Sequence, residues 1–425
     1  MLKKLGTIMV VGLAVLGVTA GVAAAGEVDL LVQKLVDKGV LTPNEAQILM
    51  DETKQDVARQ NAKGTNDAIP TWVQTTKLKG DFRLRQELAQ DKGSANDNRT
   101  RIRMRLGVET KPNDQMKVGI GIATGKLSDP RSTNVSFGTD SSASNANDPG
   151  SFKDVTLDYA FGQFTPFNGV TLTGGKFKNP LWQPNDMLWD TDLNPEGGAV
   201  QLNGNLASGV DVFLNSSIFV MNEQRTAKMS EPWLLAVQPG LAWEVADGIK
   251  LQGALAYYNF QQIQERPKFT KQSTNSLNGS NYKYNYNSIN PSLELGIQNP
   301  LGGLVPYFSI FADYVKNLSL PGSVAGGSGF DYGVKFGNEK VGDWGQWQAK
   351  LSYDRLGRDA FLDIFPDSDR YNGKTNMRSY EALLEYGLGK NTSLALDYYR
   401  SESLTRVGET YSPQQVVQVD WNLKF

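Results

Sequence analysis

The last nine residues of the chain alternate strictly between apolar and polar side chains. The apolar parity holds Val417, Val419, Trp421, Leu423 and Phe425. Between them lie Gln418, Asp420, Asn422 and Lys424. Because successive side chains of a β-strand point to opposite faces, this segment has one wholly apolar face and one wholly polar face. Half-buried strands are common in soluble sheets, so the meaning of this one depends on whether the pattern recurs.

The same period of two recurs from Lys77 to the end of the chain. In one example, Ile102, Met104 and Leu106 alternate with arginines. The alternating segments are 77–87, 99–111, 115–126, 152–163, 169–178, 196–205, 209–221, 231–245, 248–261, 290–299, 304–317, 328–340, 347–354, 378–388, 391–403 and 413–425. They predict about sixteen strands, an even number of the kind found in single-chain bacterial barrels.

The connections between these segments alternate in length. Short turns are expected at 112–114, 165–168, 207–208, 246–247, 300–303, 341–342 and 389–390. Long loops are expected at 88–98, 127–151, 179–195, 222–230, 264–289, 318–327, 357–377 and 404–412. Bacterial membrane barrels have short periplasmic turns and long external loops, whereas a soluble sandwich or propeller has no reason to sort its loops. The sequence therefore predicts an all-β transmembrane antiparallel β-barrel over residues 77–425.

Residues 1–25 have the features of a cleaved signal peptide. A basic start precedes an apolar segment at 8–18, and the small residues Ala23 and Ala25 form a cleavage site. A membrane anchor is the alternative, but the apolar segment is shorter than the roughly 20 residues that a spanning helix needs. We therefore expect an exported protein.

Residues 26–60 predict a short α-helical hairpin. Gly39 is placed where a glycine often follows a helix, and Thr42 and Glu45 form a capping box around Pro43. This hairpin is too small to bury a core of its own. The predicted topology places it on the periplasmic side, and residues 61–76 predict a linker to the barrel.

Composition excludes several classes of function. The chain contains 0 Cys and 0 His, so it lacks a disulfide framework, the commonest general base and the imidazole metal ligand. The spacing of Asp367, Asp369 and Asn372 departs from a calcium loop. We expect no enzyme activity, cofactor or metal. A net charge of −2 offers no overall basic surface for nucleic acid.

Several segments resemble the putative porins of Gram-negative bacteria. They are LLVQKLVDKGVLTPNEAQIL at 30–49, KLKGDFRLRQE at 77–87 and DLNPEGGAVQL at 192–202. The ending VDWNLKF is similar to that of outer-membrane barrels in general. The resemblance implies an outer-membrane barrel surrounded by lipid, whose C-terminal apolar residues from Val417 to Phe425 are an assembly signal for the barrel assembly machinery. General porins also imply a homotrimer.

Six basic residues share the polar face of the first two strands. They are Lys79, Arg83, Arg85, Arg101, Arg103 and Arg105. We name them the basic ladder. The alternation points all six into the lumen, where rings of charge set ion preference. The alternative is a solvated wall whose charges are balanced by Asp81, Glu87 and Glu109.

The third long loop, 179–195, combines large apolar residues with acids. Its candidate site residues are Trp182, Asp186, Trp189, Asp190 and Asp192. Loops in water seldom carry so many large apolar side chains. General porins fold their third loop into the barrel, so the resemblance implies a constriction here with its acids facing the basic ladder. The alternative is an aromatic cap over the barrel rim.

Aromatic residues of outward parity predict interfacial girdles. They include Tyr159, Trp347, Tyr353, Tyr398 and Trp421. Tyr258, Tyr307 and Phe311 have lumen parity instead, which keeps open a channel that prefers sugars.

The resulting hypothesis is a water-filled channel for passive diffusion of ions and small hydrophilic solutes. The alternative is a structural or adhesive barrel that acts through its loops or its periplasmic helices. Conductance across a planar bilayer distinguishes the two.

Overall fold

The computed structural model describes residues 42, 45–47, 51, 70–91, 97–126, 129–138, 152–223, 230–269, 273–405 and 413–425. The chain divides into two compact units, Met1–Gln74 and Thr75–Phe425. The predicted signal peptide at 1–25 lies outside the described residues, as does most of the predicted helical hairpin and linker. No helix in the described part of the chain is long and apolar enough to cross a membrane.

The described part of the first unit is small. Glu45, Ala46 and Gln47 are helical, and the four-residue α3 spans Thr71–Gln74. The backbone N–H of Thr42 donates to Glu45 Oε2 at 2.9 Å, and the N–H of Glu45 donates to Thr42 Oγ1 at 3.3 Å. This reciprocal pair is the capping box that the sequence predicts.

The second unit is built from one large antiparallel sheet. Its sixteen long strands are β1 (Lys77–Asp91), β2 (Asp97–Asn113), β3 (Met116–Thr124), β5 (Val155–Phe167), β6 (Val170–Lys176), β7 (Glu196–Ala207), β8 (Val210–Val220), β9 (Trp233–Ala246), β10 (Ile249–Gln261), β13 (Ser288–Gln298), β15 (Tyr307–Asn317), β16 (Ser328–Gly337), β17 (Trp347–Leu356), β18 (Met377–Gly389), β19 (Thr392–Ser403) and β20 (Gln414–Lys424). The two-residue β4 (Val135–Ser136) adds to β2, and β14 (Pro300–Gly303) lies in the turn before β15.

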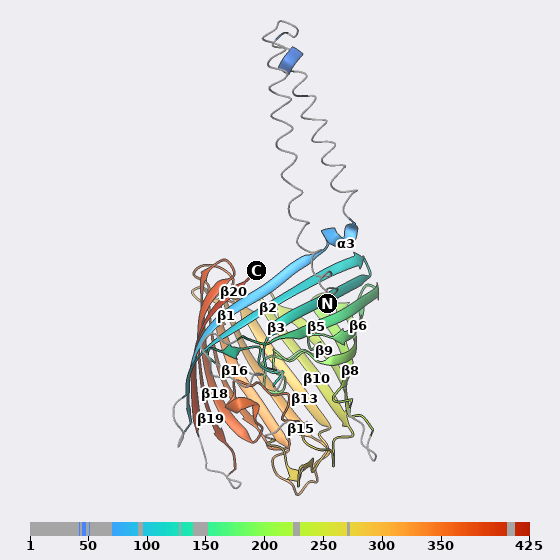
Figure 1. The fold of residues 1–425 in the computed structure, drawn as a ribbon, viewed down its shortest axis with the longest axis vertical. Helices are drawn as coiled ribbons and strands as arrows, with labels where there is room; N and C mark the ends of the chain where they lie inside the picture. Colours follow the sequence, from blue (N-terminus) through green and yellow to red (C-terminus); the bar gives the residue numbers. More distant parts are fainter. Residues whose placement is uncertain are drawn as a thin grey trace, which may run out of the picture. The chain divides into compact units, whose positions relative to one another are not determined.

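Each long strand pairs with its neighbour in chain order, and β20 pairs with β1 to close the barrel (Figure 1). The closing register runs from Asp81 opposite Lys424 to Asp91 opposite Gln414. This confirms the predicted closed antiparallel barrel of sixteen strands. One expected loop is largely strand, because β1 and β2 extend to Asp91 and Asp97 and leave only residues 92–96 of the predicted 88–98 between them.

The inner and outer faces of the barrel follow the alternation of the sequence. Outward side chains such as Leu78, Met104, Ile120 and Leu157 are large, apolar and exposed. The C-terminal strand does the same, with Val419, Trp421 and Phe425 among the exposed residues. Trp347, Tyr353 and Tyr398 share the outward parity of exposed neighbours on their strands.

A one-residue bulge in β5 reverses this parity. Gly121 pairs with Tyr159, but the next residue, Ile122, pairs with Leu157, so Asp158 has no paired residue on β3. A bulge of this kind turns every later side chain to the opposite face. The ring of Tyr159 therefore lies on the inner wall over Gly107 and Gly121. The prediction that Tyr159 belongs to an outward girdle was wrong.

Loops fold into the barrel and form its apolar core. The core joins inward strand residues such as Phe219 and Tyr258 to Trp189, Tyr282 and Phe361, which lie in three different loops. One of these loops carries the hairpin of β11 (Leu277–Asn278) and β12 (Asn281–Tyr282), and another carries the 3₁₀ turn η1 (Tyr371–Gly373). The inserted loops thus fill part of the space inside the barrel, and the basic ladder lines another part of the inner wall.

Glycines on the strands repeatedly make room for aromatic rings. Where β20 meets β1, Gly80 and Phe425 exchange backbone hydrogen bonds of 2.8 and 2.9 Å. A Cβ on Gly80 would lie 2.4 Å from the ring of Phe425. The terminal ring therefore covers a strand glycine, in the same way that aromatic side chains rescue glycines in designed sheets.

We expect Gly80→Val to destabilise the closed barrel, because the new side chain displaces the Phe425 ring. Overpacking of this kind costs about 1–3 kcal/mol in the free energy of unfolding. Urea unfolding of the refolded barrel in lipid vesicles measures this loss. Gly174→Val is the matched control, since Gly174 also lies on a strand but has no heavy atom within 4 Å of its added Cβ. Equal stabilities of the two variants would contradict the prediction.

Candidate functional site

The basic ladder lies on the inner wall where β1 and β2 pair. The register sets Arg83 opposite Arg103 and Arg85 opposite Arg101. Like charges directly opposite each other in a sheet repel and destabilise it. The structure places carboxylates from β1, β2, β20 and two loops among these cations, so the ladder is a layer of alternating charge.

On β2, the arginines bind acids from β1 and from the loop 179–195. Nε of Arg105 donates to Asp81 at 2.7 Å, and its Nη1 donates to Asp192 at 3.1 Å. Arg103 binds Asp81 at 2.8 Å and lies 3.7 Å from Asp192. Arg101 donates to Glu87 at 3.0 Å. Two arginines therefore share both Asp81 and Asp192.

On β1, the basic residues of the ladder bind acids from β20, from a loop and from β2. Arg85 donates two hydrogen bonds to Asp420 of β20, at 2.8 and 2.9 Å, and a third to Asp369 at 2.9 Å. Arg83 lies 3.3 Å from Asp420. At the end of the ladder, Lys79 donates to Glu109 at 2.8 Å. The fork of Arg85 is the bidentate geometry that binds a carboxylate most strongly.

The loop 179–195 lies inside the barrel. Asp192 accepts from Thr133 at 2.8 Å as well as from Arg105. Asp190 is 4% exposed and accepts the backbone N–H groups of Asp192 and Ser368, at 2.8 and 2.9 Å. The acids of this loop thus bind two different partners, the ladder and a second inserted loop.

The aromatic residues of the same loop anchor it to the wall and to its neighbour. Trp189 is 1% exposed, and its ring centroid lies 4.4 Å from that of Phe365. The backbone N–H of Trp182 donates to Gln238 of β9 at 2.7 Å, and Gln238 donates back to the Trp182 carbonyl at 2.8 Å. These contacts place the loop within the barrel and do not form a cap over its rim.

Arg370, which the sequence analysis did not single out, links three parts of the structure. Its guanidinium binds Asp186 of the loop 179–195 and Glu381 of β18, and it lies 3.7 Å from Asp354 of β17. Its side chain is 1% exposed. Lys350 adds a second cation, 2.5 Å from Glu381. Because charges in so buried a place are stable only when paired, this cluster holds both loops against the wall.

The insertion of the loop 357–376 into the barrel is the main feature that the sequence analysis missed. Its Asp363 accepts from Ser273 and from the backbone N–H of Thr274, each at 2.6 Å. Arg131 donates to the carbonyls of Asp363 and Gly373, at 3.1 and 2.9 Å. The signal was present, because Phe361, Leu362 and Phe365 lie among acids, as the apolar residues of 179–195 do.

Two aromatic residues of lumen parity are buried. Tyr258 and Phe311 are 3% and 1% exposed, and the ring of Phe361 lies 5.0 Å from that of Tyr258. They offer no open surface for a sugar. Tyr307 lines a cavity with Glu294 and Gln298.

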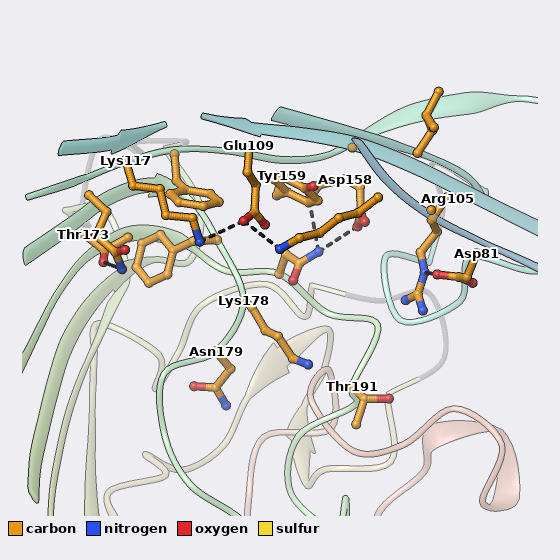
Figure 2. Close-up of a pocket in the computed structure, with 18 of the residues that line it drawn as sticks. Asp81, Arg105, Glu109, Lys117, Asp158, Tyr159, Thr173, Lys178, Asn179 and Thr191 are labelled. Atoms are coloured by element: carbon orange, nitrogen blue, oxygen red, sulfur yellow. Dashed lines mark hydrogen bonds and ion pairs between the residues drawn. The ribbon is translucent and has the colours of Figure 1, made fainter. Parts of the chain in front are cut away.

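Three cavities lie along the ladder and the inserted loops. The largest, of about 780 Å³, is lined by residues such as Lys79, Glu109 and Tyr159 (Figure 2). The second, of about 400 Å³, lies between the ladder arginines and the acids of both loops. The third, of about 430 Å³, is bounded by Trp182 and Trp189. Lys178 lines all three cavities.

Burial and charge set the ionisation of the loop acids. Burial, with the neighbouring charge of Asp192, raises the pKa of Asp190 to about 8. Burial also opposes ionisation of Asp192, but the charges of Arg103 and Arg105 outweigh it and lower the pKa of that carboxyl. Adjacent acids in one loop are therefore pushed in opposite directions, one towards the neutral form and one towards the charged form.

A closed barrel with an apolar outer face, a charged inner wall and loops folded inside it defines a porin-type β-barrel. The family model described as putative porin matches residues 89–295 and 312–425. The chain belongs to this putative porin family, as the resemblance of its segments implied. No curated protein sequence matches the chain.

Several solved structures are similar to this chain at low sequence identity. OprB of Pseudomonas putida, in a high-pH structure, has a TM-score of 0.54 and 11% identity, covering 86% of this chain and 97% of its own. Its low-pH structure has a TM-score of 0.46 and 10% identity, over 86% and 97%. A mutant porin of Rhodopseudomonas blastica has a TM-score of 0.43 and 11% identity, over 82% and 100%.

Arg370→Gln should release the two inserted loops from the wall, since it leaves Asp186 and Glu381 without their guanidinium partner. Breaking a buried pair by removing one member costs about 3–5 kcal/mol. We expect a lower thermal unfolding midpoint and faster proteolysis within 357–376. Arg378→Gln is the control, because its pair with Glu402 is 46% exposed on the arginine side, and exposed pairs contribute about 0–1 kcal/mol. Equal effects of the two changes would contradict this role for Arg370.

The docking of the loop 179–195 should weaken as pH rises through about 8, because Asp190 must then ionise in a buried place. The docked loop raises the pKa of Asp190 and so favours its protonated form. The free energy that holds the loop docked therefore falls as pH rises from the pKa of the undocked carboxyl to about 8. The near-ultraviolet circular dichroism of the stacked Trp189 reports docking, with Trp189→Phe identifying the band.

Asp190→Asn should remove this alkaline change, and Asp247→Asn, at an exposed turn, should leave it intact. An alkaline transition that persists in Asp190→Asn would assign the titration to another group.

Proposed function

We propose that this protein is a water-filled channel of the bacterial outer membrane, through which ions and small hydrophilic solutes diffuse passively. The observation that carries the proposal is the set of adjoining cavities between the basic ladder and the inserted loops. Charged and polar side chains line each cavity, and all three share Lys178 and Thr191. An apolar-lined gap would exclude ions, whereas charged side chains along a pore hold water and set ion preference.

The ion pairs of the ladder predict moderate selectivity. Asp81, Asp192 and Asp420 neutralise much of its positive charge at short range. The remaining transverse field acts across a distance comparable with the Debye length of about 8 Å at physiological salt. Charge preference should therefore be measurable at low salt and fade at high salt. The basic ladder and the acids of the loop 179–195 form the constriction in this proposal.

The remaining parts of the chain are assigned on the same proposal. Residues 1–25 are a cleaved signal peptide, and residues 26–60 form a helical hairpin in the periplasm. The barrel assembly machinery reads the apolar parity from Val417 to Phe425, and the outward apolar face contacts outer-membrane lipid. Three copies assemble as a homotrimer.

Removal of Phe425 should lower the amount of folded barrel in the membrane more than it alters the conductance of the barrels that form.

A second candidate is a structural or adhesive barrel with a closed lumen. The observation that favours it is the apolar core of Trp189, Tyr282 and Phe361 inside the barrel. Planar-bilayer recording of the purified mature protein separates the two functions. Reproducible conductance steps support the channel, and their absence from folded, inserted protein would favour the structural barrel.

We expect the triple change Arg101→Ser, Arg103→Ser and Arg105→Ser to shift the reversal potential towards cation preference at low salt. It leaves Asp81 and Asp192 without their arginine partners on β2 and removes Arg101 from Glu87, which keeps Arg99. The measurement is the reversal potential across a salt gradient. Arg378→Ser, which removes one exposed arginine from β18, is the control. An unchanged reversal potential in the triple variant would place the ladder outside the permeation path.

A further inference from the structure

Lys178 is an exposed cation in the interior of the barrel. It lies between the buried Phe177 and the start of the loop 179–195, and it lines the three cavities described above. Figure 2 shows its side chain extending into the largest cavity, with no dashed line to the other residues drawn. Within the described part of the chain, its ammonium group has neither a salt bridge nor a hydrogen bond. A ligand can therefore bind it without breaking an existing pair.

The surroundings of Lys178 carry a surplus of positive charge. Lys79 and Lys117 both bind the same oxygen of Glu109, at 2.8 and 2.9 Å, so two cations share one carboxylate (Figure 2). Asp158 faces the cavity from β5 and accepts from the side-chain amide of Asn194 at 2.7 Å. The side chains that line the cavity include five cations, Lys79, Arg105, Lys117, Lys178 and Lys424, against three carboxylates, Asp81, Glu109 and Asp158. A monoanion in the cavity would reduce this positive surplus.

The β5 bulge adds flat apolar surface to the same cavity. Tyr159 and Phe161 both line it, with their ring centroids 5.9 Å apart. Both rings lie over strand glycines, because a Cβ on Gly121 or Gly119 would fall within 2.6 Å of them. The glycines let the rings lie against the wall, so the Tyr159 ring keeps one face available to a solute, whereas the Nζ of Lys117 lies over the Phe161 ring, 5.4 Å from its centroid. Ring faces of this kind bind flat or ring-shaped solutes.

We propose that the 780 Å³ cavity is a binding site for a small monocarboxylate that carries a planar ring. Its carboxylate binds Lys178 and its ring lies against Tyr159, next to Phe161. This inference rests on the proposed channel function, because the solute reaches the cavity through the lumen. It goes further by naming the class of solute that the channel retains.

The test is the block of single-channel current by benzoate in planar bilayers containing the full mature protein. Benzoate should reduce the current at concentrations about tenfold below those of acetate, which lacks the ring. Benzylamine, which has the opposite charge, should not block the current.

Lys178→Gln should weaken the benzoate block about tenfold, as expected when a charged hydrogen bond is lost. Lys178→Arg should retain most of the block. Tyr159→Ala should bring benzoate close to acetate.

Lys250→Gln is the matched control, since it removes one inward lysine that lines a different cavity. It should leave the benzoate block unchanged. Channels that conduct but show equal benzoate block in the wild type, Lys178→Gln and Lys250→Gln would overturn the site. Equal block by acetate and benzoate would overturn the role of the rings. Absence of conductance in the wild type would instead overturn the proposed function.

Discussion

The fold depends on closing the sheet so that neither edge is left free. Lipid offers no hydrogen-bond partner to a backbone N–H or C=O group, so a sheet that spans it must close. Pairing of β20 with β1 removes both edges. Closure also brings Asp420 of β20 beside Arg83 and Arg85 of β1. The charge layer of the inner wall is therefore partly a product of closure, since neighbouring strands in the ring supply the opposite charges.

The architecture could be predicted because a barrel repeats one simple rule. Side chains alternate between the outer and inner faces of the barrel along its strands, and loop lengths alternate between the two ends, so the sixteen strands were predicted within a few residues. The rule fails where the backbone departs from it. The bulge at Asp158 has no mark in the pattern of apolar and polar residues, so counting parity placed Tyr159 on the wrong face. Nothing in the strand pattern indicated that β1 extends to Asp91.

The candidate site was less predictable, because it depends on contacts between residues far apart in the chain. The alternation along each strand indicated which arginines share a face, but the acids that bind them lie on other strands and in loops. Asp369 reaches Arg85 from a loop 284 residues away in the sequence, and only the folded loop shows which acid binds which arginine. Arg370 is a single arginine in a polar loop, and its importance comes from burial beside Glu381. Loop insertion is decided by packing in three dimensions, which no local period encodes.

The inserted loops are bonded to one another as well as to the wall. Asp363 joins the loop 357–376 to residues 273 and 274, Arg131 joins it to the segment before β4, and Phe365 packs against Trp189. A set of segments linked in this way opens as one cooperative unit, because releasing any member removes buried partners from the others. Fluctuations of these loops should therefore be rare and concerted. Hydrogen exchange of their amides would then follow a single opening equilibrium, separate from the slower exchange of the barrel strands.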